Sequence, residues 1–321
     1  DRRQRQMCIR DRNILVTGGA GFIGSHITDA LIEAGHKVAV VDNLSSGTKE
    51  YINKAAAFYE FDVRDGERLL SLCGAERFDA VFHEAAQTQV PYSQTYPQID
   101  ADENIMGLLS VLESARKTGV KRVVFSSSAA VYGDNPNVPL REDAPVAPTS
   151  FYGLSKVVSE QYLQMYHKVF GLEYIILRYA NVYGERQGIH GEGGVVYVFS
   201  AALAAGKKLT VFGDGEQSRD FVYVKDVAQA NLAALQGDVR PGIYNIGTTV
   251  ETTVNALKEI LFYLSGVTTA VYYDDVRDGD IIRSALDNGK AKAQLHWRPH
   301  TKLIPGLTST YAYFAEEASR E

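Results

Sequence analysis

Tyr152, Lys156 and Ser128 are the residues of this chain whose types and spacing suggest acid–base chemistry. Tyr152 and Lys156 are four positions apart in "YGLSKVVSEQYLQMYHKVFG", so a helix over this stretch places both side chains on one face. A lysine ammonium beside a phenol favours the phenolate and lowers its pKa from about 10. A phenolate near neutral pH is a usable general base, and a serine hydroxyl can relay the proton. Ser128, the third serine of "KRVVFSSS", stands at the end of a predicted strand and can play that part.

A glycine-rich turn near the start of the chain could hold a dinucleotide. In "TGGAGFIG", Gly18, Gly21 and Gly24 follow an apolar strand and open a helix, which lets a pyrophosphate approach backbone N–H groups closely. The next strand ends at Asp42, about 20 residues on, where a carboxylate accepts from a ribose 2′-hydroxyl. Asp42 would repel a 2′-phosphate and no arginine follows at once, so the pattern favours NAD over NADP. The positive charge of an oxidised nicotinamide would lower the phenol pKa further.

Two other predicted strand ends carry polar residues. Asp62 in "FDVRD" could accept from an adenine amino group or cap the next helix, and the sequence leaves both open. The stretch "HEAAQT" follows the fourth strand, close to the cofactor in this topology. His83 has no second ligand nearby and the chain has no HExxH motif, so no metal role is expected.

These candidates need a scaffold that collects strand ends at one edge. From residue 13 onward apolar strands alternate with helical stretches, which predicts an α/β fold with a doubly wound parallel sheet of the Rossmann type. Ligands of such sheets bind at the carboxyl ends of the strands. Strands are expected over 13–19, 37–43, 56–63, 79–86 and 121–128, and helices over 22–35 and 104–117.

The chain is expected to divide into two domains. Residues 13–180 form the predicted NAD-binding domain and 181–321 a smaller α/β substrate domain, which includes one helix and one strand over 193–215. The stretches "DFVYVKDVAQANLAAL" and "IYNIG", about 220–246, are predicted to return to the first domain, which makes the second domain discontinuous. Residues 1–12, with five arginines and no apolar core, are expected to be a non-native or disordered tail.

Composition excludes several classes of protein. The 321 residues are 45% hydrophobic, enough for a sizeable core, and carry a net charge of −6 with no basic patch, so no nucleic-acid partner is expected. Cys8 and Cys73 are too few for a disulfide framework or a zinc site, and we expect reduced cysteines in the cytoplasm. No apolar run approaches the about 18 residues of a membrane span, so no membrane partner is expected.

Several motifs together resemble the extended short-chain dehydrogenases/reductases, and within them the UDP-glucose 4-epimerases. They are "TGGAGFIGSH", "VDNLSSG", "DVRD", "SSSAAVYG", "YGLSK", "LRYANVYG", "VFGDGEQSRDFVYVKDVA", "YNIG" and "RDGD", and they span about 13–297. The resemblance implies tightly bound NAD. The residues it leads us to expect around NAD are Gly18, Gly21, Phe22, Ile23, Gly24, Asp42, Asn43, Asp62, Val63, Ala85, Ala86, Asn104, Ser126, Tyr152, Lys156 and Tyr179.

The resemblance also implies a reaction. Tyr152 and Lys156 with Ser128 would be the catalytic set, and Asn181, Arg219 and Arg277 would hold the UDP part of a UDP-sugar substrate. Tyr152 would take the proton of the sugar 4-hydroxyl with Ser128 bridging, while the C4 hydride is transferred to NAD. The 4-keto sugar would then turn and take the hydride back on its other face. Some epimerases carry a lysine after the fourth strand, but this chain has Thr88 there, so that contact is not expected.

Related enzymes differ at the two alanines of "SSSAAVYG". The 4,6-dehydratases carry Thr-Asp-Glu where this chain has Ser128, Ala129 and Ala130, and UDP-glucuronate decarboxylases carry Glu in place of Ala130. Epimerisation of UDP-N-acetylglucosamine or UDP-glucuronate stays open, because it needs the same minimal set. An NAD(P)H-dependent sugar-nucleotide reductase is a less favoured alternative, which would exchange its cofactor, whereas an epimerase should keep NAD bound. A non-catalytic NAD-sensing protein would be expected to lack one of the three catalytic residues.

One position bears on the choice of sugar. Ser284 stands four residues after the Asp of the "GD" pair, a place that lines the sugar pocket in the family and carries a bulky aromatic residue in some epimerases. A serine leaves more room, so UDP-N-acetylhexosamines are predicted to be tolerated. The alternative, a neutral spacer, stays open.

Two helical stretches favour a homodimer. The stretches 104–117 and 154–170 carry apolar residues on more than one face, and family members commonly pair through such helices. Burial of both helices within one subunit is the alternative. The apolar residues are Ile105, Leu108, Leu109, Leu112, Val157, Val158, Tyr162 and Met165.

Overall fold

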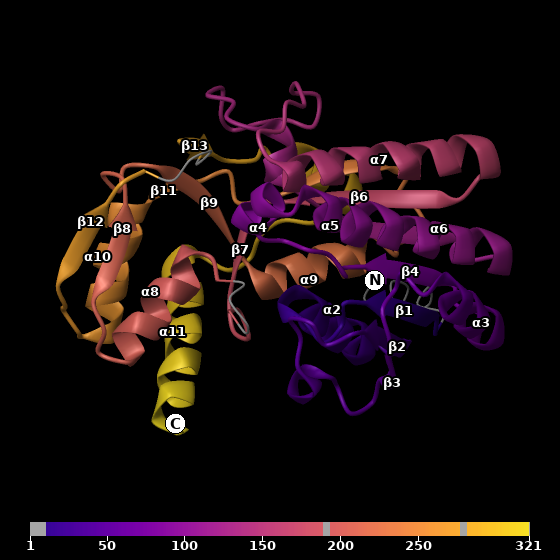
Figure 1. Cartoon of the computed structure of the whole chain (residues 1–321), viewed down its shortest axis with the longest axis horizontal. Coiled ribbons are helices and arrows are strands. Elements are labelled where there is room, and N and C mark those ends of the chain that lie inside the picture. The colour runs from indigo at the N-terminus through magenta and orange to yellow at the C-terminus, as the bar shows by residue number, and fades with distance from the viewer. Residues whose placement is uncertain (1–10, 189–192, 277–280, 321) are drawn as a thin grey trace, which may run out of the picture.

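A parallel sheet forms the centre of the fold, which confirms the predicted doubly wound α/β class. The computed structural model describes residues 11–188, 193–276 and 281–320. Seven strands lie in the order β10-β6-β5-β4-β1-β2-β3, all in parallel pairs (Figure 1). The order reverses between β1 and β4, so a crevice for ligands is expected at their carboxyl ends. The strands are β1 (Asn13–Thr17), β2 (Lys37–Asp42), β3 (Ala57–Glu60), β4 (Ala80–His83), β5 (Arg122–Ser128), β6 (Glu173–Tyr179) and β10 (Gly242–Ile246).

Helices cover both faces of this main sheet. Successive side chains of a strand point to opposite faces, so the apolar strands place apolar side chains on both faces, and the helices bury them. Ile14 and Val16 lie in the apolar cluster that includes α2 and α9. Leu15 and Val41 lie in the other cluster, with α3, α6 and α7. The predicted helix over 22–35 is confirmed and ends at Glu33. The helices beside this sheet are α2 (Phe22–Glu33), α3 (Gly66–Glu76), α4 (Val90–Thr95), α5 (Pro97–Ala101), α6 (Gly107–Thr118), α7 (Phe151–Phe170) and α9 (Val224–Ala233).

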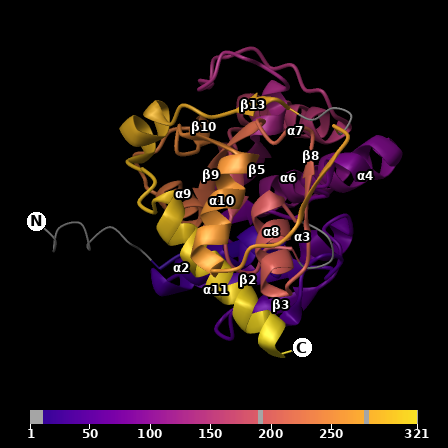
Figure 2. The same ribbon diagram turned by 90° about the vertical axis from the view of Figure 1, so that its left-hand side faces the viewer.

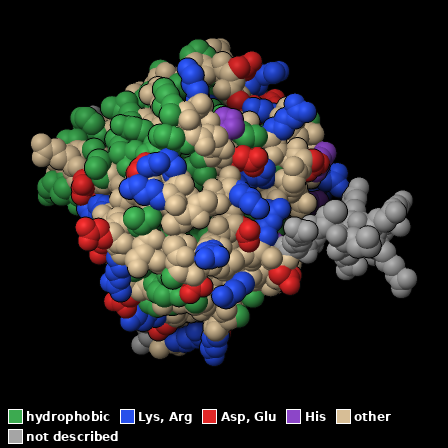
Figure 3. Space-filling model, turned by 90° about the vertical axis from the view of Figure 1, so that its right-hand side faces the viewer, with side chains coloured by type: hydrophobic (Ala, Val, Ile, Leu, Met, Phe, Trp, Pro, Cys, Tyr) green, Lys and Arg blue, Asp and Glu red, His purple; other side chains and the backbone are tan. Residues whose placement is uncertain are grey.

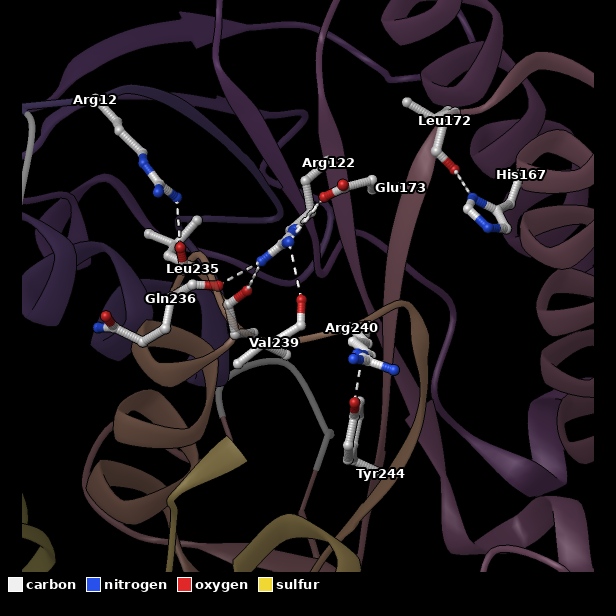
Figure 4. A network of polar contacts seen from close by, with 11 residues as sticks. Arg12, Arg122, His167, Leu172, Glu173, Leu235, Gln236, Val239, Arg240 and Tyr244 are labelled. Carbon is white, nitrogen blue, oxygen red and sulfur yellow. Dashed lines mark hydrogen bonds and ion pairs between the residues drawn. The ribbon is translucent and has the colours of Figure 1, made fainter. Parts of the chain in front are cut away.

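An arginine fastens the end of α9 to the sheet. Arg122, at the start of β5, donates from Nη1 to the carbonyl oxygens of Ala234 at 2.7 Å and Gln236 at 3.0 Å, and from Nη2 to that of Val239 at 3.0 Å (Figure 4). Its guanidinium also pairs with Glu173 on β6 at 2.7 Å. Ala234 is the C-cap of α9, and its carbonyl lacks a partner within the helix, so the bond from Arg122 satisfies it. The bonds to Gln236 and Val239 hold the connection that leads to β10, beside β6.

The remaining elements form a smaller lobe, at the left of Figure 1 and facing the viewer in Figure 2. Strand β9 pairs with β7, β11 and β13, and β8 pairs with β12. A third apolar cluster, which contains Tyr183, Phe199 and Leu257, packs the lobe together. The helix and strand predicted within 193–215 are confirmed as α8 and β8. The elements of the lobe are β7 (Asn181–Tyr183), α8 (Val195–Ala204), β8 (Leu209–Phe212), β9 (Ser218–Tyr223), β11 (Glu251–Thr253), α10 (Val254–Ser265), β12 (Val271–Asp274), β13 (Arg283–Ser284) and α11 (Leu303–Arg320).

Short turns of helix complete the part of the chain that the structure describes. The predicted helix over 104–117 begins in a π-helical turn, η3 (Asp102–Met106), and continues as α6. A 3₁₀ turn, η4 (Ala129–Tyr132), follows β5 directly. The other two are η2 (Lys49–Tyr51) and η6 (Ala291–Leu295). Of the predicted tail over 1–12, all but Asp11 and Arg12 lies outside the described residues.

Candidate active site

A cavity of about 710 Å³ lies at the carboxyl edge of the main sheet. Strand ends and the turns after them line one side, and residues of β7, β8, β9 and α8 line the other. Every residue predicted to contact NAD lines this cavity except Asn104. The cavity is within the size range of sites that hold small organic ligands.

The glycine turn between β1 and α2 has no room for side chains. Gly18 has a φ of +71°, and a Cβ there would lie 2.5 Å from the backbone nitrogen of Ala85. A Cβ on Gly24 would lie 2.2 Å from the carbonyl oxygen of Gly18. The helix begins at Phe22 with Gly21 as its N-cap, so no capping side chain occupies the first N–H groups. Gly21 and Phe22 line the cavity, and this cradle fits a dinucleotide pyrophosphate.

Asp42 stands at the end of β2 with its carboxylate held by the backbone. Its Oδ2 accepts from the Ala20 N–H at 3.0 Å and its Oδ1 from the Leu44 N–H at 2.8 Å. Burial raises the pKa of this carboxyl above its usual value, and the two backbone bonds oppose that shift. The fixed carboxylate lines the cavity where a ribose hydroxyl could donate to it.

Asp62 is the acceptor of a small charged cluster rather than a helix cap. Its carboxylate pairs with Arg64 at 2.6 Å and accepts from Asn43 Nδ2 at 3.0 Å. The hydrogen bonds from Arg64 lower the pKa of Asp62 to about 2. The cap of α3 is Asp65, so that alternative for Asp62 is wrong. Arg64 also pairs with Asp102 at 2.6 Å, so two carboxylates offset the charge that could otherwise attract a 2′-phosphate.

The predicted pair on α7 lies at the other end of the cavity. Ser150 caps this helix by accepting from the Gly153 N–H at 3.0 Å, which starts the helix just before Tyr152. Lys156 donates from Nζ to the Ser126 carbonyl at 2.9 Å, and Nζ lies 5.8 Å from the centroid of the Tyr152 ring. Burial lowers the pKa of Lys156 to about 8, while the acids Glu84, Asp100 and Glu160 oppose that shift. The ammonium is therefore placed to stabilise a Tyr152 phenolate.

The three serines at the end of β5 have different partners. Ser126 donates to the His83 carbonyl at 3.0 Å, and Ser127 donates to Glu160 at 2.6 Å. Glu160 is ion-paired with Arg178 at 2.6 Å, with both side chains buried. Ser128 accepts from the Ala130 N–H at 3.2 Å and lines the cavity, so its own proton can still be donated. The structure thus separates Ser128 from the two serines that join elements.

Asn104 is buried behind the cavity wall. Its Oδ1 accepts from the Gln87 N–H at 2.8 Å, and its Nδ2 donates to Asp100 at 3.2 Å and to Ser155 Oγ at 3.0 Å. These bonds join the turn after β4 to α7. Asn104 therefore does not line the cavity, and any influence on a bound cofactor would come from the wall residues that it holds in place.

The predicted substrate residues are only partly brought together. Asn181 and Arg219 line the cavity from β7 and β9. Ser284 is buried in β13, in register with Arg219, but it is not among the lining residues. Arg277 lies outside the described residues, so its predicted role stays a prediction.

Sequence reasoning missed several wall residues. Glu84 lines the cavity directly after β4, and only its place in the quoted stretch "HEAAQT" hinted at this. Phe199, Phe212 and Gln217 line it from the smaller lobe, where no local motif marks them.

Two absences hold for the part of the chain that the structure describes. Within it no group of three or more His, Cys, Asp or Glu residues could hold a metal ion. No described helix is long and apolar enough to cross a membrane.

Comparison with known proteins agrees with this site. Residues 14–247 match the model of the NAD dependent epimerase/dehydratase family, and the chain belongs to that family. It is 45% identical over 295 residues to a putative UDP-glucose 4-epimerase of Methanocaldococcus jannaschii, which covers 92% of this chain and 95% of the relative.

Two solved structures are similar over nearly their whole length. A UDP-glucose 4-epimerase of Thermotoga maritima with UDP-glucose has a TM-score of 0.93 and 46% identity, with 95% of this chain and 99% of that chain covered. A UDP-N-acetylglucosamine 4-epimerase of Methanobrevibacter ruminantium has a TM-score of 0.91 and 38% identity, with 96% and 100% covered.

Proposed function

We propose that this chain catalyses the NAD-dependent 4-epimerisation of a UDP-hexose, interconverting UDP-glucose and UDP-galactose. The observation that carries the proposal is one cavity that joins a dinucleotide cradle to the set Ser128, Tyr152 and Lys156. Ala129 and Ala130 stand where related lyases carry their extra acids, which favours epimerisation over dehydration or decarboxylation. The named relatives support the choice of UDP-hexose.

The cradle and the carboxylates fit NAD. Gly18 and Gly24 would admit its pyrophosphate, Asp42 would accept from a ribose hydroxyl, and Lys156 would hold the second ribose. When bound, NAD accepts a hydride from the sugar carbon and gives it back, so no net oxidation occurs.

The chain's own residues handle the proton and the orientation of the sugar. Tyr152, as phenolate, takes the proton of the 4-hydroxyl and later returns it to the same oxygen. The Lys156 ammonium keeps the phenolate available near neutral pH, and Ser128 bridges the hydroxyl and the phenol. Asn181 and Arg219 would hold the UDP part, so the sugar ring can turn while its anchor stays in place. We retain Arg277 as a second arginine for the diphosphate.

The test is incubation of the purified protein with UDP-galactose and no added NAD, followed by assay of UDP-glucose. We expect conversion, because an epimerase regenerates its cofactor in each turnover. A plain reductase would instead need a supply of NADH or NADPH. Folded, NAD-containing protein with no conversion would overturn the proposal.

UDP-N-acetylglucosamine is a second candidate substrate, favoured by the Methanobrevibacter ruminantium enzyme and by the small Ser284. We expect turnover on both sugars by the parent chain. In Ser284→Tyr, turnover on UDP-N-acetylglucosamine should fall about tenfold or more relative to UDP-glucose, because a tyrosine is too large for the buried position of Ser284 and should displace the neighbouring Arg219, which lines the cavity. An unchanged ratio would show that Ser284 does not select the sugar.

We also propose a homodimer formed through α6 and α7. The supporting observation is a set of exposed apolar side chains on α7 and on the turn before α6, and Figure 3 has hydrophobic side chains gathered on part of the face at this end of the molecule. Covering such a patch in water is favourable. Met165→Asp should convert a dimer into monomers in light scattering, while Tyr263→Asp on α10 should not. The exposed side chains are Met106, Leu154, Tyr162, Met165, Val169 and Phe170.

A reducing compartment, the cytoplasm, is the proposed location. Burial raises the pKa of the Cys73 thiol to about 11, which suits an unreactive reduced cysteine. Fractionation of cells that make the protein, with detection of the protein in each fraction, would test this.

A further inference from the structure

Arg178 is a buried arginine behind the catalytic end of the cavity, and the proposed reaction gives it no part. It lies on β6, opposite Ser127 of β5 in the register of the two strands, and does not line the cavity. Its Nε and Nη2 donate to the two carboxylate oxygens of Glu160 at 2.8 and 2.6 Å. Its Nη1 donates to the Tyr132 hydroxyl at 2.8 Å, and its Cζ lies 4.7 Å from the centroid of that ring. One guanidinium thus joins both α7 and η4 to β6.

The ion pair of Arg178 with Glu160 is enclosed by the protein, with side chains that are 3% and 4% exposed. Two charges taken out of water lose their hydration, and this cost cancels much of their attraction, so such a pair contributes little net stability compared with apolar side chains. It does supply fixed geometry, because a planar guanidinium binds a carboxylate through two parallel bonds. The pair is therefore best explained by the elements that it fixes in place.

The carboxylate of the pair lies on the helix that carries the proposed base. Tyr152, Lys156 and Glu160 follow one another at four-residue spacing on α7, so they share one face of the helix. Lys156 donates to a backbone carbonyl of β5 at 2.9 Å, and Glu160 accepts from Ser127 Oγ at 2.6 Å. These bonds and the guanidinium hold α7 against β5 and β6, and with it the position of Tyr152.

The tyrosine held by Arg178 ends the turn that Ser128 begins. Ser128 is the N-cap of η4 and accepts from the Ala130 N–H at 3.2 Å. Tyr132, the last residue of η4, is 1% exposed, and its hydroxyl donates to Asn245 Oδ1 on β10 at 2.8 Å. The turn is therefore held by β5 at its first end and by Arg178 and Asn245 at its last, and the orientation of Ser128 depends on both.

We propose that Arg178 is a positioning residue that holds Ser128 and the Tyr152 phenol at the separation that proton transfer needs. The two groups belong to elements in close contact, since a Cβ on Gly153 would lie 2.7 Å from the Ala130 carbonyl oxygen. A misplacement of about 1 Å can cost about a hundredfold in rate. Arg178 itself exchanges no proton and makes no new bond. The inference rests on the proposed function, in which both groups act on one sugar hydroxyl.

The test is a double-mutant cycle of Tyr132→Phe and Ser128→Ala, measured as kcat and KM for UDP-galactose. Tyr132→Phe removes only the hydroxyl that Arg178 holds, and the ring remains. We expect kcat about tenfold below the parent, with the KM and the bound NAD unchanged, because the misplacement affects the proton transfer alone. In the Ser128→Ala background the same change should alter kcat by less than about twofold, because the hydroxyl that it positions is already gone.

Tyr244→Phe is the matched control. Tyr244 is also 1% exposed, and its hydroxyl donates to the Arg240 carbonyl at 2.8 Å, away from η4 and α7 (Figure 4). This variant should keep the kcat of the parent. The inference would be overturned if Tyr132→Phe lowered kcat equally in both backgrounds, if it left kcat unchanged, or if Tyr244→Phe caused the same loss.

A second experiment removes the guanidinium without leaving a buried charge. Arg178→Met combined with Glu160→Leu replaces the pair by apolar side chains, a change that buried ion pairs often tolerate. In folded protein with NAD bound we expect kcat about a hundredfold below the parent. A pair that serves stability alone predicts the parent kcat in this variant, and that result would overturn the inference. If the variant does not fold, the Tyr132→Phe cycle decides.

Failure of the inference is distinct from failure of the proposed function. A folded, NAD-containing parent that does not convert UDP-galactose would overturn the proposed function and this inference with it. A parent that converts UDP-galactose, with Tyr132→Phe equal to it in kcat, would overturn the inference alone.

Discussion

The two sides of the cavity are built in different ways. The cofactor side consists of strand ends and short turns of one sheet, and its main features are backbone features: a glycine cradle, a helix start and a carboxylate held by backbone N–H groups. The substrate side combines side chains from β7, β8, β9 and α8, which are separated along the chain. The first side can hold a tightly bound, invariant ligand, whereas the second can change its choice of sugar without disturbing the sheet. Four predictions test this contrast, from the largest expected effect to the smallest.

Tyr152→Phe should abolish chemistry where the two sides meet. We expect turnover of UDP-galactose to fall about a thousandfold, because the general base is lost while the ring remains. Bound NAD, measured by absorbance after denaturation, should stay at the parent level. Tyr263→Phe, on the exposed face of α10, is the control. A loss of less than tenfold would mean that Tyr152 is not the base.

Gly18→Ala should damage the cofactor side itself. The added Cβ meets the Ala85 nitrogen at 2.5 Å, so the turn must move away from β4. We expect about a tenfold or greater loss of bound NAD and a lower melting temperature. Gly119→Ala is matched in backbone strain, with a φ of +79°, but its Cβ meets nothing within 4 Å. It should therefore retain NAD, and equal losses in both variants would point to backbone strain instead of the close approach.

Arg219→Ala should affect the substrate side alone. We expect the KM for the UDP-sugar to rise about tenfold to a hundredfold, the effect of losing a charge-assisted contact to a diphosphate, with bound NAD unchanged. Arg283→Ala is a useful control, because this exposed arginine of the neighbouring strand pairs with Glu251. If Arg219→Ala released NAD, the two sides would not be independent.

His26→Gln should give the smallest effect, at the junction of the two lobes. His26, on α2, contacts the Glu185 carbonyl through Nε2 at 3.1 Å, and burial lowers its pKa to about 4. Between pH 6.5 and 4 the unfolded chain binds this proton and the folded chain does not, so the free energy of unfolding falls as the pH falls. In the variant, the slope of the free energy of unfolding against pH should be smaller than in the parent by at most about 1.4 kcal/mol per pH unit.

The measurement for His26→Gln is denaturant unfolding of both proteins at pH 7, 6 and 5. His83, whose pKa burial lowers to about 3, remains in both proteins and supplies a common acid slope. Identical slopes would show that His26 is not kept neutral by burial in the folded protein at these pH values.

Much of the cofactor side was predictable, because its residues follow strands at short range. The alternation of apolar strands and helices predicted the sheet, and the glycine spacing predicted the cradle. The pair Tyr152 and Lys156 was predicted from its helical spacing together with its place after the glycine turn and the serine-rich strand end. The alternative role for Asp62 was decided only by the structure, since Asp65 caps α3 instead.

The substrate side was far less predictable. Sequence patterns indicated Arg219 and Ser284 only through a family resemblance, and no periodicity says that Phe199 and Phe212 line the same cavity. The π-helical turn at Asn104 was also missed, because a pattern of apolar residues does not distinguish it from an α-helix. These features depend on contacts between distant segments, which local preferences do not specify.

By itself, the sequence determined which residues can do chemistry and the order of strands and helices that carry them, because both depend on residue type and short-range spacing. Only the tertiary structure decided the surroundings of those residues: that Ser127 joins a buried ion pair while Ser128 reaches the cavity, and that Lys156 donates to the Ser126 carbonyl. Burial and neighbouring charge set the protonation of such groups, and both arise only when strands and helices far apart in the chain pack together.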